Sequence, residues 1–104
     1  MHERYTHLMT IDEVQRLLAS HRGRLDALGI TRVRVFGSCA RGEHTASSDL
    51  DLLVDFDHPV GLLELSSVKI ELEGILRASV DLATAGMLRD ELREQVLAEA
   101  RVAA

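Results

Sequence analysis

Apolar residues recur along this chain with two spacings, one typical of helices and one typical of strands. The helical spacing first runs from Ile11 to Leu28 and ends at Gly29, while Thr10 and Glu13 form a capping-box pattern ahead of it. Six residues at this spacing are expected to enter the core: Ile11, Val14, Leu17, Leu18, Leu25 and Leu28. The pattern therefore predicts one helix over residues 11–28.

Three segments instead alternate between apolar and polar residues, which predicts strands over residues 31–36, 49–56 and 79–84. In the second segment, one set of side chains is expected on the apolar face: Leu50, Leu52, Val54 and Phe56. The other face would carry Asp49, Asp51, Leu53 and Asp55. Few residues separate the first two segments, so a standard long crossover between them is excluded.

Two further stretches return to helical spacing. The first, residues 61–77, would bury Leu62, Leu65, Leu72, Ile75 and Leu76, and the second, residues 87–101, would bury Leu88, Leu92 and Val96. The predicted order is helix, strand, strand, helix, strand, helix. The expected fold class is α/β (α+β), with a small mixed sheet of about three strands and helices packed on it. With 104 residues, the chain is expected to form a single domain, residues 1–104.

Composition removes several classes of function. The formal net charge of −5 and the scarcity of aromatic residues argue against direct nucleic-acid binding. A single cysteine, Cys39, excludes an internal disulfide and a thiolate cage for zinc, and the five histidines are scattered. No run of residues is apolar enough for a membrane span or a signal peptide, so we expect no membrane contact and a cytoplasmic protein.

Three carboxylates stand out against this background. Asp49 and Asp51 are two apart on a predicted strand, so their Cβ atoms lie about 7 Å apart on one face. Carboxylates in this arrangement suit Mg²⁺, which prefers oxygen ligands and keeps positions open for phosphates. Asp81 lies between two apolar residues of a later strand, where an acid is costly unless it is paired or binds metal.

A glycine and a serine follow the first predicted strand directly. Gly37 allows a close approach of the backbone to a ligand, and the amides of the turn after it can face a phosphate. Ser38 adds a hydroxyl donor. Taken alone, such a pair is more often an ordinary turn, and an isolated Asp-x-Asp is also weak evidence for a site.

The combination is specific. Gly37-Ser38, a gap of ten residues, and Asp49-x-Asp51 with Asp81 on a later strand resemble the DNA-polymerase-β-like nucleotidyltransferase superfamily. Within it, the chain is similar to the minimal nucleotidyltransferases, over roughly residues 33–101. Two further segments match, Ala40-Arg41-Gly42 after the turn and Ser47-Ser48 before the acids.

The resemblance implies a nucleotidyltransferase fold and a role for each matched residue. Asp49 and Asp51 would hold two Mg²⁺ ions, and Asp81 would complete that metal site and help deprotonate the attacking hydroxyl. Gly37 and Ser38 would bind the β- and γ-phosphates of a nucleoside triphosphate, which the resemblance indicates is ATP. The matching Arg41 and Ser48 would also be nucleotide-binding.

The resemblance further implies a partner. Many minimal nucleotidyltransferases are antitoxins that transfer AMP to a tyrosine of a HEPN-domain ribonuclease toxin. We therefore expect a Mg-dependent protein adenylyltransferase acting as an antitoxin on a HEPN-family toxin. The alternative is a catalytically weak antitoxin that neutralises its toxin by stoichiometric binding, for which apolar residues of the last predicted helix would supply the surface.

The chain departs from the family in two places. Cys39 stands where relatives often have Arg, which would remove a contact to phosphate, and the chain ends in small residues where relatives often have an aromatic. Neither change removes a carboxylate. Phosphatases and glycosyltransferases with Asp-x-Asp motifs are excluded because 104 residues leave no room for their remaining motifs. Sequence alone leaves the acceptor, the base preference and the oligomeric state open.

Overall fold

A computed structural model of the chain describes residues 9–42 and 49–104. Its elements, in chain order, are α1 (Ile11–Ser20), α2 (Arg22–Ala27), β1 (Ile30–Phe36), α3 (Gly37–Ala40), β2 (Leu50–Phe56), α4 (Leu62–Leu76), β3 (Val80–Ala83), η1 (Ala85–Met87), α5 (Asp90–Glu99) and β4 (Arg101–Val102). The predicted α/β class, with helices packed on a small mixed sheet, is confirmed.

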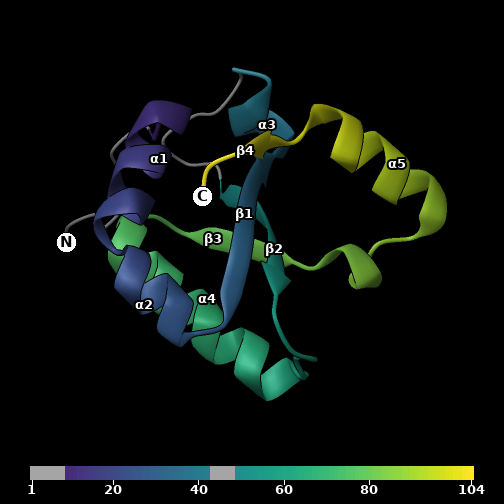
Figure 1. Ribbon diagram of the computed structural model, residues 1–104. Coiled ribbons are helices and arrows are strands. Elements are labelled where there is room, and N and C mark those ends of the chain that lie inside the picture. The colour runs from purple at the N-terminus through teal and green to yellow at the C-terminus, as the bar shows by residue number, and fades with distance from the viewer. Residues whose placement is uncertain (1–8, 43–48) are drawn as a thin grey trace, which may run out of the picture.

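The sheet has the strand order β3-β2-β1-β4. β1 pairs antiparallel with both β2 and β4, whereas β2 and β3 are parallel and are joined through α4. The antiparallel β1–β2 pair agrees with the short link between the two strands, and the parallel pair agrees with the long helical crossover. Figure 1 shows α1, α2 and α4 together on one side of the sheet and α5 on the other.

The main core lies between the sheet and the layer formed by α1, α2 and α4. Alternate residues of β1 and β2 enter it, and five of them are fully buried: Val33, Val35, Leu50, Leu52 and Val54. Val14, Leu18, Leu25, Leu72 and Leu76 supply the helical side. Burial of these aliphatic side chains is the main source of stability, at roughly 25 cal/mol per Å² of apolar surface.

The helix predicted over residues 11–28 is interrupted at His21. This residue has φ −117° and ψ 27°, so α1 ends there and α2 begins at the next residue. The His21 Nδ1 lies 2.9 Å from the Leu17 carbonyl oxygen, which gives the end of α1 a side-chain partner. The capping box predicted from Thr10 and Glu13 is present.

The last predicted helix was wrong in its bounds. Instead of residues 87–101, the chain forms the 3₁₀ turn η1, then α5, and the extended Ala100 leads into β4. β4 pairs with β1, an interaction that helical periodicity does not reveal. Two expected core residues are also wrong: Leu92 is 46% exposed and Leu62 is 79% exposed, whereas Val96 is buried.

No described helix, in either residues 9–42 or residues 49–104, is long and apolar enough to cross a bilayer.

Candidate active site

The two acid-bearing strands lie next to each other in the sheet. In the parallel register of β2 and β3, Asp51 is the direct partner of Asp81, so both side chains leave the same face. Asp49 precedes β2 by one residue and lies on that side too, close enough for its charge to act on Asp51. The sheet therefore brings together the three acids that the sequence singled out.

Gly37 meets this group from the end of β1. Its φ of +71° is a conformation that favours glycine. A Cβ at this position would overlap Oδ2 of Asp51 and stand 3.0 Å from its Cγ. Glycine is therefore required for two reasons, the backbone turn that starts α3 and the close approach of the Asp51 carboxyl group.

The electrostatics centre on Asp51. Partial burial, the like charges of Asp81 and Asp49, and a hydrogen bond with Asp81 raise the pKa of Asp51 to about 6, against an opposing effect of Arg41. Three carboxylates on one face therefore repel each other, and a bound cation would relieve that repulsion.

The donor set fits a hard divalent cation in its chemistry, since all three side chains offer carboxylate oxygens. As the side chains stand, no group of three His, Cys, Asp or Glu residues within residues 9–42 and 49–104 is arranged as a finished metal site. The Asp51 carboxyl group is turned against Gly37, while Asp49 and Asp81 are exposed. Rotation of exposed carboxylates, together with phosphate and water ligands, is the usual way such a site is completed for Mg²⁺.

The structure describes the remaining predicted nucleotide-binding residues to different extents. Arg41 caps α3 and donates from Nη1 to Oε1 of Glu99 over 3.2 Å, and its charge acts on Asp51. Ser38 lies on α3, but its side chain is outside the described part of the molecule, and so is the whole of Ser48. Glu99, which positions Arg41, was not found from the sequence because it lies far along the chain on α5.

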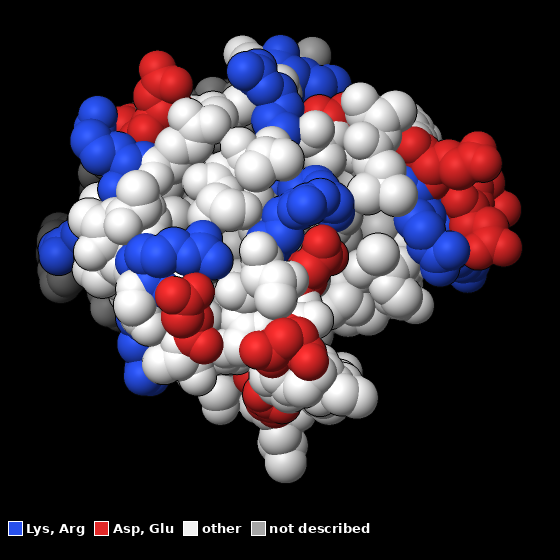
Figure 2. All heavy atoms as spheres, viewed as in Figure 1, with Lys and Arg blue, Asp and Glu red and all other residues white. Residues whose placement is uncertain are grey.

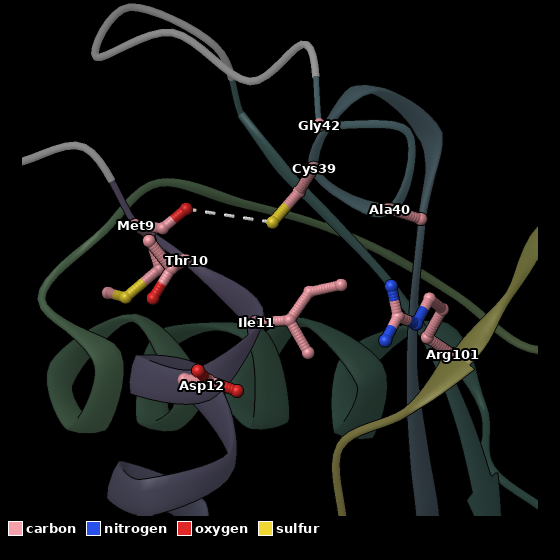
Figure 3. A pocket seen from close by; sticks show the side chains of 8 residues that line it. All are labelled: Met9, Thr10, Ile11, Asp12, Cys39, Ala40, Gly42 and Arg101. Carbon is pink, nitrogen blue, oxygen red and sulfur yellow. Dashed lines mark hydrogen bonds between the residues drawn. The ribbon is translucent and has the colours of Figure 1, made fainter.

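Cys39, which the sequence analysis interpreted as a departure from the family pattern, is part of the core. It is 6% exposed, and its Sγ donates to the Met9 carbonyl oxygen over 3.6 Å. Figure 3 shows the sulfur turned toward Met9 at the rim of a cavity of about 320 Å³ that Arg101 also lines. None of the three acids lines this cavity, but Cys39 is close enough to Asp51 to feel its charge: burial and then the Asp51 carboxylate raise the pKa of the Cys39 thiol.

The face that carries the acids is only partly covered. Leu53 of β2 is fully buried and Val96 of α5 is buried, both outside the main core, so α5 shields part of this face. Arg34 lies opposite Leu53 and pairs with Asp55 at 3.6 Å, a contact that the sequence analysis did not identify. In Figure 2, acidic side chains gather over α5, and basic side chains are dispersed among acidic ones elsewhere on the viewed face.

Comparisons with known proteins identify the family and the fold. A family model for the nucleotidyltransferase domain matches residues 18–103. The protein adenylyltransferase MntA of Thermococcus cleftensis is 34% identical over 93 residues, covering 88% of this chain and 94% of the relative. A solved structure described as a "putative minimal nucleotidyltransferase" is 42% identical, with a TM-score of 0.75, covering 89% of this chain and 95% of that one.

A more distant solved structure shares the fold. It is a complex of a tri-AMPylated Shewanella oneidensis HEPN toxin with an MNT antitoxin, of which one chain has a TM-score of 0.63 at 17% identity. The match covers 88% of this chain and 71% of that one. From the family model and the identity to MntA, the chain belongs to the nucleotidyltransferase family and is an enzyme of that class.

Proposed function

We propose that this nucleotidyltransferase transfers AMP from ATP to a hydroxyl group of a protein partner, a tyrosine of a HEPN ribonuclease toxin, and thereby acts as its antitoxin. The observation that carries this proposal is the meeting of Asp49, Asp51 and Asp81 on one face of the sheet beside Gly37. The naming of relatives as a protein adenylyltransferase and as an MNT antitoxin of a HEPN toxin supports the acceptor class.

In the proposed reaction, the acceptor oxygen attacks the α-phosphorus of ATP. A new phosphorus–oxygen bond forms, the bond to the bridging oxygen of the β-phosphate breaks, and pyrophosphate leaves with that electron pair. We assign to Asp81, whose side chain is exposed and is the strand neighbour of Asp51, the role of taking the hydroxyl proton. The Gly37–Ser38 turn would hold the β- and γ-phosphates.

Asp49, Asp51 and Asp81 would hold two Mg²⁺ ions. When bound, these ions would neutralise charge on the phosphate oxygens and favour the deprotonated acceptor. Arg41 adds a fixed positive charge near Asp51, and Glu99 holds its guanidinium in place. The residues of the chain therefore contribute charge, orientation and a proton acceptor.

A second function, neutralisation by binding alone, is favoured by apolar side chains near the open face. Four of them are about half exposed on η1, α5 and β4: Met87, Leu92, Leu97 and Val102. Such a surface is typical of a protein interface. A toxin that docks on this surface could be inhibited without transfer of AMP.

Labelled ATP separates the two functions. The purified chain is incubated with Mg²⁺ and the protein encoded next to it, using ATP labelled at the α- or the γ-phosphate. Transfer of AMP predicts label on the partner from α-labelled ATP alone and its loss in Asp49→Asn. Asp26→Asn is the matched control, because Asp26 is a surface acid paired with Arg22.

The readout is both label and toxin activity. If the Asp49→Asn protein still protects against the toxin while transferring no label, binding alone is the function. If neither label nor protection is found with the native chain, the proposed function is wrong.

A further inference from the structure

β2 extends past the strand that accompanies it. The parallel pairing of β2 and β3 ends at Leu53 and Ala83, but β2 continues to Phe56. Residues 54–56 therefore still have β1 on one side, while the other side is the position where β3 would continue. In Figure 1 the chain leaves the end of β3 and turns through η1 toward α5.

The hydrogen bonds of Val33 fix the direction of the Val54 main chain. Val33 donates to the Ala104 carbonyl oxygen over 2.9 Å and accepts from the Ala103 amide over 2.8 Å, so its main-chain groups face β4. Val54, the cross-strand partner of Val33, is therefore in a non-hydrogen-bonded pair with β1. Its amide and carbonyl groups face the β3 side of the sheet.

Phe56 points the same way. The Asp57 amide donates to the Gly29 carbonyl oxygen over 2.8 Å, so Asp57 faces β1 and Phe56, one residue earlier, faces away from it. The Val54 carbonyl and the Phe56 amide are thus neighbours along one free edge of β2. Among the described residues, neither has a main-chain partner beyond the end of β3.

The segment after β3, which could have paired with this edge, is held in the turn η1. The Ala85 carbonyl oxygen accepts from the Leu88 amide over 3.2 Å and from Nε of Arg93 over 3.0 Å. Arg93 also donates to the Leu88 carbonyl oxygen over 3.1 Å. Arg93 of α5 therefore fixes η1 in its turn, and this keeps the edge of β2 open.

A cavity of about 370 Å³ occupies the space between residues 54–56 and residues 84–86. This volume is in the range of small-molecule sites, and its lining is mixed, with Asp55, His58 and Thr84 beside the apolar residues. Main-chain polar groups aimed into such a cavity can fix the orientation of a ligand. Among the lining residues, Gly86 has open space where a Cβ would stand.

The cavity is within reach of the acids. Val54 is three residues beyond Asp51, and Thr84 is three residues beyond Asp81 on the parallel strand, so each separation is about 10 Å. Leu53, which is fully buried, and Ala83 lie between as a cross-strand pair on the face of Asp81. A nucleoside whose α-phosphate lies at the acids can span this separation and place its base in the cavity.

We propose that the free edge of β2 recognises the adenine base of the nucleotide, an inference that rests on the proposed function. The Val54 carbonyl oxygen accepts from the 6-amino group, and the Phe56 amide donates to N1. Guanine presents an oxygen at position 6 and a hydrogen on N1, so both contacts become repulsive. Main-chain hydrogen bonds therefore select the base, which explains why no side-chain motif in the sequence indicates the base preference.

Modified nucleotides test each contact separately. Binding to the native chain with Mg²⁺ is measured by calorimetry for ATP, purine riboside triphosphate, which lacks the 6-amino group, and 1-deaza-ATP, which lacks N1. Each of the two analogues is expected to bind about tenfold more weakly than ATP, the effect of one hydrogen bond. 7-Deaza-ATP is the matched control and should bind like ATP, because N7 contacts neither group.

Two variants of Phe56 test the protein side. Phe56→Pro removes the amide donor at an edge position that tolerates proline, whereas Phe56→Leu removes the ring but keeps the donor. Relative to Phe56→Leu, Phe56→Pro should bind ATP about tenfold more weakly and should no longer distinguish ATP from 1-deaza-ATP.

A filled cavity gives an independent test if the proline variant does not fold. Gly86→Leu should weaken ATP binding, whereas Gly23→Leu, at another glycine with open space around it, should leave binding unchanged. Equal binding of ATP, purine riboside triphosphate and 1-deaza-ATP to the native chain overturns the proposal.

Failure of the proposed function has a different signature. In that case the native chain, like Asp51→Asn, leaves the partner unlabelled, whatever the base. If labelling requires Asp51 but the analogues bind as ATP does, the transferase function stands and the assignment of the base site is wrong.

Discussion

The two faces of β2 differ in almost every physical property, although their residues alternate along one strand. On the face toward α4, Leu50, Leu52 and Val54 are fully buried among aliphatic side chains. On the opposite face, Asp51 is half-buried among like charges and Leu53 is the single buried apolar residue of β2. The packed face therefore stabilises the fold, whereas repulsion among the carboxylates on the other face lowers that stability.

From this difference we expect substitutions on the packed face of β2 to change stability, and substitutions on the carboxylate face to change activity. Removal of an apolar side chain from the packed face creates a cavity and lowers the free energy of unfolding. Removal of a carboxylate from the other face removes repulsion as well as a ligand, so it should affect catalysis without unfolding the chain. The following variants test whether the two faces differ in this way.

The largest effect is expected for Asp51→Ala. Loss of the central carboxylate should lower AMP transfer by roughly a thousandfold or more, since the transition-state charge it helps to neutralise is worth several kcal/mol. The thermal midpoint without Mg²⁺ should not fall. Transfer is measured with α-labelled ATP, and melts with and without Mg²⁺ should show stabilisation of the native chain only. Near-normal transfer by this variant would remove Asp51 from the site.

Leu52→Ala probes the packed face at the next residue. Because Leu52 is fully buried, the free energy of unfolding should fall by about 2–5 kcal/mol, as measured by urea denaturation. Transfer per folded molecule should be unchanged. Leu62→Ala is the matched control, since Leu62 is 79% exposed and should change stability by less than about 0.5 kcal/mol. Equal losses in the two variants would contradict the assigned core.

Gly37→Ala tests the place where backbone and carboxylate meet. The positive φ should cost roughly 1–2 kcal/mol, and the new methyl group should also displace the Asp51 carboxyl and lower transfer. Gly42→Ala has a similar φ of +75° but open space around its Cβ, so it reports the backbone cost alone. The comparison needs urea denaturation and the transfer assay for both variants. Equal activity in the two would show that the Asp51 contact is unimportant.

The smallest effect is expected at His58, which follows the end of β2. Hydrogen bonds to Asp57 at 2.7 Å and to Glu64 at 2.6 Å raise the pKa of His58 above its ordinary value of 6.5. A raised histidine pKa contributes stability that is fully present below pH 6.5 and is lost as pH rises through the folded-state pKa. Thermal melts across this range should show a small decline that His58→Gln lacks. An NMR titration that places the pKa of His58 below 6.5 would contradict the assignment.

Much of this molecule follows from local sequence. The alternation in residues 49–56 predicted which side chains of β2 enter the core, and the helix over residues 61–77 is α4 within a residue at each end. Thr10 and Glu13 predicted the capped start of α1. These features depend on neighbours in the chain, whose spacing is visible in the sequence.

Other features depend on residues that are distant in sequence. β4 exists because Arg101 and Val102 pair with β1, and neither residue carries a strand signal of its own. The break at His21, the exposure of Leu92 and the burial of Cys39 likewise depend on what packs beside them. Periodicity reports a possible buried face, but the partner that covers it is set by topology.

The sequence by itself determined the acids, the glycine turn, their order and the family that they indicate, because chemistry of this kind needs particular side chains at fixed spacing. Tertiary structure decided that Asp51 and Asp81 are direct neighbours, that Gly37 leaves space for a carboxyl group, and that β2 ends in an open edge. These are properties of strand register and chain direction. They arise when hydrogen bonds join segments that the sequence keeps apart, so no local pattern encodes them.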